Sequence, residues 1–236
     1  MSKKIVGITG RAGSGKSTVA AQLEGLFPGS EAFALADPIK VFAAAVFGFS
    51  QTQLWGPSVA RGEVLPQSPE FWAKATRIFR QQGYSALVGW AGMFQPIAGS
   101  VRGFADWFTL LRSECQADPK LLTARHVLQT LGTEFGRANL GPDVWVNRAL
   151  RLIDRTDCSV AIITDVRFDN EARAIVDAGG VVINVRRLVA EAAPVTHESE
   201  QGINPDLVRA TVLNAGTIED LRNEVQSTFE TLGWLP

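Results

Sequence analysis

Short apolar runs alternate with longer amphipathic stretches in the N-terminal and C-terminal parts of the chain. The runs have the length of buried strands, and the stretches repeat their apolar residues at the helical period. The runs predict strands at 3–8, 32–36, 159–164, 181–185 and 211–214. The stretches predict helices at about 16–26, 38–47 and 217–231, and a further helix that ends at Ala178. Strands that alternate with helices indicate an α/β fold.

This alternation is lost between Gly48 and about Leu122, where glycines, prolines and four of the six tryptophans are scattered. We interpret residues 49–122 as a mostly helical insertion, with helices expected near 69–81 and 104–116. An insertion beside a ligand site is often a lobe that covers the substrate, but the packing of a larger core would leave the same pattern. Arg61 is the residue of this region for which we predict a phosphate contact.

Residues 123–137 form an amphipathic stretch with helical period. The apolar side carries Val127, Leu128, Leu131 and Phe135, and the polar side carries Arg125, Gln129, Thr133 and Arg137. A solvated surface would explain the polar side. Gly132, however, lies inside the expected helix, where glycine costs roughly 1 kcal/mol relative to alanine. The close approach of a ligand would explain this glycine. A helix that ends near Arg155 follows Asp143 and Trp145.

Residues 10–17, Gly-Arg-Ala-Gly-Ser-Gly-Lys-Ser, lie between the first strand and the first helix. They match the phosphate-binding loop G-x-x-x-x-G-K-[ST] in the strand–loop–helix context that this motif requires. The three glycines allow positive φ, so that successive N–H groups can surround phosphate oxygens at the positive end of the helix. Lys16 would reach the β- and γ-phosphates, and Ser17 would bind Mg²⁺. The expected phosphate contacts are Gly10, Arg11, Gly13, Ser14, Gly15, Lys16, Ser17 and Thr18.

Charged residues also follow other predicted strands, at the edge where open α/β sheets place their ligands. Asp37 and Lys40 follow the second strand, and Asp37 could cap a helix, belong to the site, or do both. Asp165 ends the strand 159–164, where it could bind Mg²⁺ directly or through water. Its successor is Val166 rather than the carboxylate common in ATPases that hydrolyse water, which favours transfer to another acceptor.

Arginines follow the strand 159–164 and the strand 181–185. Arg167 comes directly after Asp165 and Val166, and Arg186 lies where the strand 181–185 leaves the sheet. Residues 187–206 lack periodicity and are expected to form a lid over the phosphates.

Composition narrows the class of ligand. A chain of 236 residues can bury one full core, so we expect a single domain, 1–236, with the insertion and the lid as elaborations. The net charge of −1 disfavours nucleic-acid binding, and the positive charge is mostly arginine, which suits bidentate phosphate recognition.

Cys115 and Cys158 match no metal or redox spacing and are expected to be structural thiols. No run is long and apolar enough to span a bilayer, so we expect no membrane partner and a cytoplasmic location.

Taken together, these features resemble the phage-type deoxynucleoside monophosphate kinases. The resemblance rests on the loop and on five further segments, which are more specific than the loop. These segments are Leu-Ala-Asp-Pro at 35–38, Leu-Gln-Thr-Leu-Gly-Thr-Glu-Phe-Gly-Arg at 128–137, Asp143 with Trp145, Thr-Asp-Val-Arg-Phe-Asp-Asn-Glu at 164–171, and His-Glu-Ser-Glu at 197–200. The resemblance covers the chain except much of 60–120.

The resemblance implies a three-layer P-loop NTPase fold with a five-stranded parallel sheet. It also implies transfer of the γ-phosphoryl group of ATP to a deoxynucleoside 5′-monophosphate, with Mg²⁺ and often as a homodimer, in the host cytoplasm if the chain is phage-encoded. It places Arg125, Gly132, Thr133, Arg137, Trp145 and Asp165 on the acceptor side. We add Ala36, Asp37, Lys40 and Arg61 to the expected substrate contacts. The expected catalytic residues are Lys16, Arg137, Asp165, Arg167 and Arg186, and the expected metal ligands are Ser17 and Asp165.

The chemistry of such a transfer agrees with these residues. An acceptor phosphate with a second pKa of about 6 is largely ionised at neutral pH and needs no general base. Catalysis would then consist of positioning and charge stabilisation by Lys16, Mg²⁺ and arginines. Trp145 could stack on the acceptor base or belong to the core.

Other activities remain open from the sequence. A dephospho-coenzyme A kinase or another small-molecule kinase would have the same core, and a nucleotide-gated interaction module would share the loop. A GTPase is disfavoured because the chain has no N-K-x-D guanine signature.

Overall fold

A computed structural model describes residues 3–92, 98–191 and 201–235. The contacts divide the chain into two compact units, one formed by Met1–Leu35 with Ala149–Pro236 and the other by Ala36–Arg148. The second unit extends beyond the expected insertion at both ends. Residues 192–200 of the expected lid, including His197, lie outside the described residues.

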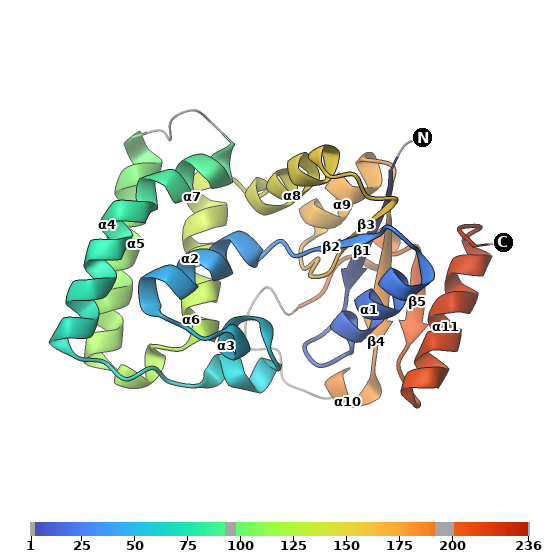
Figure 1. Ribbon diagram of the computed structural model, residues 1–236, viewed down its shortest axis with the longest axis horizontal. Coiled ribbons are helices and arrows are strands. Elements are labelled where there is room, and N and C mark those ends of the chain that lie inside the picture. Colours follow the sequence, from blue (N-terminus) through green and yellow to red (C-terminus); the bar gives the residue numbers. More distant parts are fainter. Residues whose placement is uncertain (1–2, 93–97, 192–200, 236) are drawn as a thin grey trace. The chain divides into compact units, whose positions relative to one another are not determined.

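The first unit is built on a five-stranded parallel sheet (Figure 1). Its strands are β1 (Lys4–Thr9), β2 (Glu31–Phe33), β3 (Val160–Ile163), β4 (Val181–Arg186) and β5 (Ala210–Leu213), in the order β2-β3-β1-β4-β5. Because the strands are parallel, their carboxyl ends meet at one edge of the sheet. Together with the helices on both of its faces, this sheet confirms the expected three-layer α/β fold.

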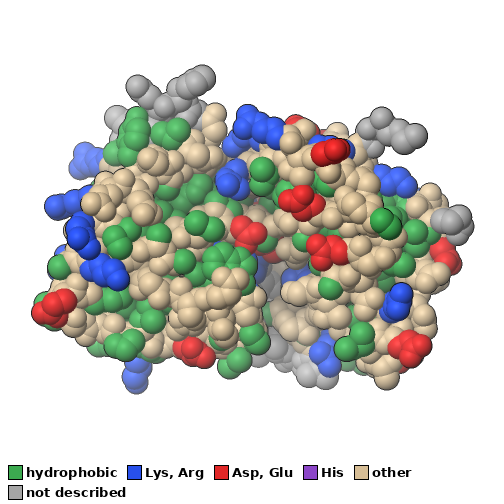
Figure 2. All heavy atoms as spheres, in the orientation of Figure 1, with side chains coloured by type: hydrophobic (Ala, Val, Ile, Leu, Met, Phe, Trp, Pro, Cys, Tyr) green, Lys and Arg blue, Asp and Glu red, His purple; other side chains and the backbone are tan. Residues whose placement is uncertain are grey.

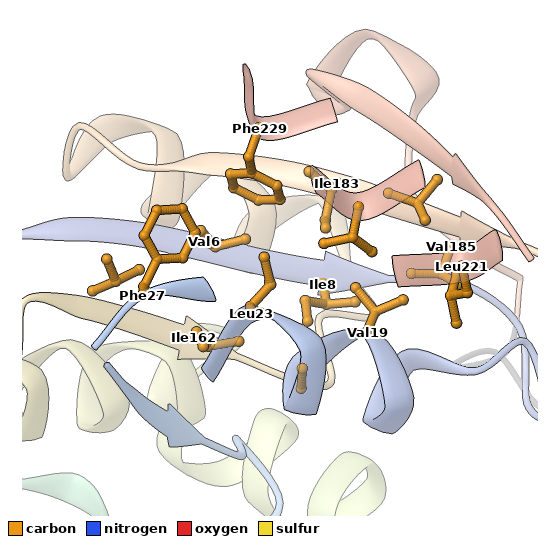
Figure 3. Packing of buried hydrophobic residues seen from close by; sticks show 14 residues of the cluster. Val6, Ile8, Val19, Leu23, Phe27, Ile162, Ile183, Val185, Leu221 and Phe229 are labelled. Atoms are coloured by element: carbon orange, nitrogen blue, oxygen red, sulfur yellow. The ribbon is translucent and has the colours of Figure 1, made fainter. Parts of the chain in front are cut away.

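Helices cover both faces of this sheet. They are α1 (Lys16–Leu26), α9 (Asp169–Asp177) and α11 (Ile218–Thr231), with the short α10 (Leu188–Glu191) and η5 (Pro205–Leu207) after β4. Figure 3 shows Val19 and Leu23 of α1 and Leu221 and Phe229 of α11 beside alternate side chains of the strands. The strand side chains on this face include Val6, Ile8, Ile162, Ile183 and Val185, all buried in one cluster. On the opposite face, Ile175 of α9 lies so close to Gly7 that any side chain at position 7 would displace it.

The second unit is helical. It contains α2 (Asp37–Phe47), α3 (Gln51–Trp55), η1 (Ser58–Gly62), α4 (Pro69–Ala91), α5 (Ala98–Ala117), η2 (Pro119–Leu121), α6 (Ala124–Gln129), the π-helix η3 (Thr130–Arg137) and α7 (Ala138–Leu140). Helix α8 (Val144–Arg155) runs from this unit into the first one. The helices predicted at 69–81 and 104–116 are confirmed, but both are longer than predicted.

Aromatic side chains form much of the core of the second unit. The rings of Phe79 and Phe108 stack with centroids 4.2 Å apart, and those of Phe104 and Phe135 stack at 4.8 Å. The tryptophans scattered through the expected insertion therefore include core residues, as the buried Trp72 shows. Figure 2 shows basic side chains gathered over α4 on the outer surface of this unit.

The prediction of one α-helix over 123–137 is wrong in its second half, because the chain widens into a π-helix from Thr130. Two glycines of this π-helix contact one tryptophan that follows it. The Trp145 indole donates to the Gly132 carbonyl oxygen at 2.9 Å, and its ring lies directly on Gly136. A π-helix is rare and often accompanies functional sites.

The two cysteines are buried thiols in the structure. Burial raises the pKa of Cys115 to about 11, with smaller contributions from Glu114 and Asp118, and burial also raises the pKa of Cys158. Both thiols are therefore protonated at neutral pH, which fits their expected structural role. None of the described helices combines the length and the hydropathy that a membrane-spanning segment needs.

Gly136→Ala tests the packing of Trp145 on the π-helix. An added Cβ would overlap the indole ring, and overpacking of this kind typically costs about 1–3 kcal/mol of unfolding free energy. Gly89→Ala is the matched control, because Gly89 lies inside the helix α4 with no atom near the added Cβ. We expect this control to stabilise the protein by about 0.4–1 kcal/mol. Urea unfolding of the two variants would measure both effects, and equal stabilities would contradict the packing argument.

Candidate active site

The phosphate-binding loop lies between β1 and α1 and has the backbone geometry that its glycines permit. Gly10, Gly13 and Gly15 have φ of 140°, 78° and 102°, whereas no described non-glycine residue has a positive φ. Gly15 is also the N-cap residue of α1. The N-terminus of α1 thus opens onto the loop, and this arrangement favours the binding of anions.

Lys16, the first residue of α1, folds back along the loop. Its Nζ donates to the carbonyl oxygens of Gly10 at 2.6 Å and of Arg11 at 2.8 Å. The ammonium group therefore lies at the loop, where a phosphate could exchange for these carbonyl partners. Ser17 and Thr18 follow in the first turn of α1.

Neighbouring strands hold the loop in place. The backbone of Gly10 lies directly on the Val185 carbonyl of β4, so position 10 leaves no room for a side chain. Asn214, which follows β5, donates through Nδ2 to the Ser14 carbonyl oxygen at 2.9 Å. The same amide nitrogen occupies the space that a Cβ on Gly15 would need. The backbone N–H of Asn214 donates to the Arg186 carbonyl oxygen at 2.8 Å, and this bond joins the ends of β4 and β5.

Asn214 lies at the end of the strand predicted at 211–214, and its contact with the loop was not predicted. The available signal was an amide side chain directly after the last strand of a sheet with a phosphate-binding loop. The partner of this amide, however, lies 200 positions away in the sequence.

The half-buried Asp165 lies just after β3, at the same edge of the sheet as the loop. Its Oδ1 accepts a hydrogen bond of 2.6 Å from the Leu35 backbone, which fixes the orientation of the carboxylate. The buried Glu171 of α9 accepts from the backbone N–H groups of Arg167 at 2.8 Å and Phe168 at 3.1 Å. This capping contact sets the path of the chain that carries Asp165 and Arg167. Glu171 belongs to the segment 164–171 that carries the family resemblance, but this role was not predicted for it.

Asp37 and Lys40 form a polar cluster with Trp55 in the second unit. Oδ1 of Asp37 accepts from Lys40 Nζ at 3.2 Å and from the Trp55 indole at 2.9 Å. Asp37 begins α2 after the N-cap residue Ala36, and no side chain caps this helix. The alternative role of Asp37 as a helix cap is therefore wrong. Lys40 is buried, with 9% of its surface exposed, and Asp37 compensates its charge.

The polar residues expected on the acceptor side lie on α6 and η3. Arg125, Thr133 and Arg137 are all half-buried, and Arg137 donates to the Pro142 carbonyl oxygen at 2.8 Å. Helix α6 contacts α2 and also η1, which carries the half-buried Arg61. The second unit therefore brings together the elements that carry Asp37, Lys40, Arg61 and Arg125.

The protein itself makes the close approach at Gly132 that we had expected from a ligand. A Cβ at this position would lie 3.0 Å from the Ile39 side chain, and the Gly132 carbonyl accepts from Trp145. Trp145 is 5% exposed and makes an edge contact with Trp90 at 5.5 Å between ring centroids. These contacts agree with the core alternative for Trp145.

A cavity of about 740 Å³ adjoins the loop within the first unit. Gly10, Arg11, Ser14 and Arg186 line it, whereas Asp165 and Arg167 do not. Among the residues that the structure describes, no group of three or more His, Cys, Asp or Glu side chains could hold a metal ion.

Comparison with known proteins places the chain in a family. The family model described as deoxynucleotide monophosphate kinase matches residues 104–225. The deoxynucleoside-5′-monophosphate kinase of Escherichia phage T5 is 27% identical in an alignment 243 residues long that covers 94% of each chain. The crystal structure of TT1252 from Thermus thermophilus aligns with 98% of this chain and 99% of its own, at 20% identity and a TM-score of 0.41. The family match spans more than half of the sequence, and the chain therefore belongs to the deoxynucleotide monophosphate kinase family.

Proposed function

We propose that the chain transfers the γ-phosphoryl group of ATP to a deoxynucleoside 5′-monophosphate, and that the loop between β1 and α1 holds the donor phosphates. The observation that supports this most strongly is the loop itself, with three glycines at positive φ before α1. Family membership makes the chain a kinase that uses nucleotide substrates and an ATP donor. It also disfavours the alternatives of a dephospho-coenzyme A kinase and of an interaction module without catalysis.

On the donor side, backbone N–H groups of residues 10–18 would bind the phosphate oxygens, as the positive φ of Gly10, Gly13 and Gly15 allows. Lys16 would exchange its bonds to Gly10 and Arg11 for bonds to the β- and γ-phosphates. Arg186, at the end of β4, and Arg167, after β3, would stabilise the negative charge that shifts during transfer.

The residues present fit a Mg²⁺ ion held by few protein ligands. Mg²⁺ in phosphoryl-transfer sites is commonly bound by one or two protein groups together with substrate phosphates, so a dense carboxylate cluster is not required. We propose the Ser17 hydroxyl and the Asp165 carboxylate as these groups. The bond from Leu35 would hold Asp165 in a fixed orientation for this role. When bound, Mg²⁺ would neutralise part of the phosphate charge.

On the acceptor side, we propose that Ala36, Asp37, Lys40, Arg61, Arg125, Thr133 and Arg137 bind the deoxynucleoside monophosphate. The arginines can grip its phosphate by bidentate hydrogen bonds, which lysine cannot reproduce. We also propose that Gly132 and Trp145 belong to this site. The hydrogen bond between them would help to shape the π-helix that carries Thr133 and Arg137. The homodimer and the cytoplasmic location stay predictions.

A panel of acceptors tests the proposed function. With ATP and Mg²⁺, we expect the protein to form diphosphates from deoxynucleoside monophosphates and to leave dephospho-coenzyme A unchanged. Lys16→Ala should lower the rate roughly 10²–10³-fold, as the loss of one electrostatic donor typically does. Lys74→Ala is the matched control on exposed α4 and should keep the wild-type rate. Absence of transfer to every deoxynucleotide, or an unaffected Lys16→Ala variant, would refute the proposal.

Asp165→Asn tests the metal role of this carboxylate. The variant should need more Mg²⁺ for activity and recover partly with excess Mg²⁺ or with Mn²⁺, because it has lost a charged ligand. Activity measured against metal concentration at fixed substrates gives the answer. Asp177→Asn, an exposed carboxylate at the end of α9, serves as the control. Metal curves of wild type and Asp165→Asn that differ only in height would exclude the metal role.

We also propose that Asn214 is a positioning residue for the loop. Asn214→Asp keeps the shape but replaces the donating amide by an oxygen that faces the Ser14 carbonyl oxygen. We expect KM for ATP to rise about 10-fold, since a lost hydrogen bond and an unpaired carbonyl cost about 1–3 kcal/mol. KM for the deoxynucleotide should stay unchanged. Asn139→Asp is the control, because Asn139 of the second unit donates in the same manner to the Phe135 carbonyl oxygen and makes no hydrogen bond to the loop in the described structure. If both variants lose stability alike and neither changes KM for ATP, Asn214 is merely structural.

A further inference from the structure

Three polar side chains lie side by side across the sheet of the first unit. In the strand register Thr9 of β1 is opposite Asn184 of β4, and Asn184 is opposite Thr211 of β5. Side chains alternate between the two faces of a strand, and the neighbours Ile8, Ile183, Val185 and Val212 all belong to the buried cluster under α1 and α11. The polar row of Thr9, Asn184 and Thr211 therefore lies on the opposite face. Strands of a parallel sheet are usually apolar on both faces. This polar row therefore indicates a ligand or another polar group that it contacts.

The same three residues line the cavity of about 740 Å³ beside the loop. This volume lies in the range of small-molecule sites. Four arginines also line the cavity: Arg11, Arg186, Arg187 and Arg209. None of the described lining residues is an Asp or a Glu. The cavity therefore combines high positive charge with neutral hydrogen-bonding groups, which is the chemistry that binds phosphate oxygens.

The loop supplies an independent indication of a ligand site. Ser14 lines the cavity and is 1% exposed, and its hydroxyl oxygen is a buried polar atom without a hydrogen-bond partner among the described residues. Buried hydroxyl groups are nearly always hydrogen-bonded, so this atom fits a site that a ligand completes. Gly10 and Arg11 of the loop also line the cavity, which makes it continuous with the proposed donor site.

We propose that this cavity binds phosphate groups of the donor nucleotide, and that Arg209, Asn184 and Thr211 are donor contacts beyond the loop. The inference rests on the proposed function for the identity of the nucleotide. Arg209 precedes β5, and its backbone N–H donates to Val182 at 2.7 Å, which ties its position to the edge of β4. Because Arg209 is exposed and lines the cavity, its guanidinium is placed to contact a phosphate bound there.

Titration calorimetry on the full chain tests this inference without catalysis. The ligands are a non-hydrolysable ATP analogue, inorganic tripolyphosphate and a deoxynucleoside monophosphate, each added alone. Arg209→Gln should lower the affinity for the ATP analogue and for tripolyphosphate about 10-fold, as expected for the loss of one charged hydrogen bond. Its affinity for the ATP analogue should also depend less on salt, since one screened charge is lost. Arg222→Gln, an exposed arginine on α11, is the control and should bind as wild type does.

Thr211→Val removes a hydroxyl from the exposed end of the polar row while keeping the size and β-branching of the side chain. This variant should lower the affinity for the ATP analogue about 2–10-fold, which corresponds to the loss of one neutral hydrogen bond. Unchanged affinity of both variants for the analogue and for tripolyphosphate would overturn the inference. Weaker binding of the monophosphate alone would assign the cavity to the acceptor and also overturn it. If the wild type binds the ATP analogue but phosphorylates no deoxynucleotide, the proposed function fails while the cavity assignment stands.

Discussion

The first unit depends on one constraint: the loop after β1 must turn its backbone N–H groups toward one point. Only glycine adopts the required positive φ without strain, and Gly10, Gly13 and Gly15 occupy those positions. A loop of this kind would lose its shape if it stood alone in water. Here β4 lies against Gly10 through the Val185 carbonyl, and Asn214 after β5 lies against Gly15. The parallel order of the sheet makes both contacts possible, because β4 and β5 end at the same edge as β1.

The chemistry imposes a second requirement, since two anionic reactants must meet in line. The residues around the loop provide positive charge and hydrogen-bond donors, and no acid–base pair is needed for an acceptor that is already ionised. In the second unit, the cations are compensated or held in place by their own contacts: Lys40 by Asp37, and Arg137 by the Pro142 carbonyl. Such contacts reduce the number of conformations that these side chains would lose on binding a phosphate.

Much of the first unit could be predicted from the sequence because its signals are local. The loop motif, the apolar strand runs and Asp165 at a strand end all depend on neighbours within a few residues. The π-helix could not be predicted, because residues 123–137 have the apolar period of an ordinary helix. Its contacts with Trp145, which donates to Gly132 and lies on Gly136, come from outside this segment.

The remaining misses arise from strand pairing. Asn214 meets the loop, and Thr9, Asn184 and Thr211 meet one another, only once the order β1-β4-β5 and its register are known. Each of these residues is unremarkable in its own segment. In the second unit, Arg125, Thr133 and Arg137 were predicted from the family resemblance, since periodicity alone would have made them a solvated surface. Asp37 and Lys40 were predicted from their position after a strand.

The central claim is that donor and acceptor are recognised by different parts of the chain, the donor by the loop and the acceptor by α6 and η3. Hydrogen exchange of the full chain, with a non-hydrolysable ATP analogue alone and with a deoxynucleoside monophosphate alone, tests it most directly. We predict that the analogue slows exchange in residues 10–18 and leaves 125–137 unchanged, and that the monophosphate slows exchange in 125–137. Protection of the same segment by both nucleotides, or protection of 125–137 by the analogue alone, would contradict the account.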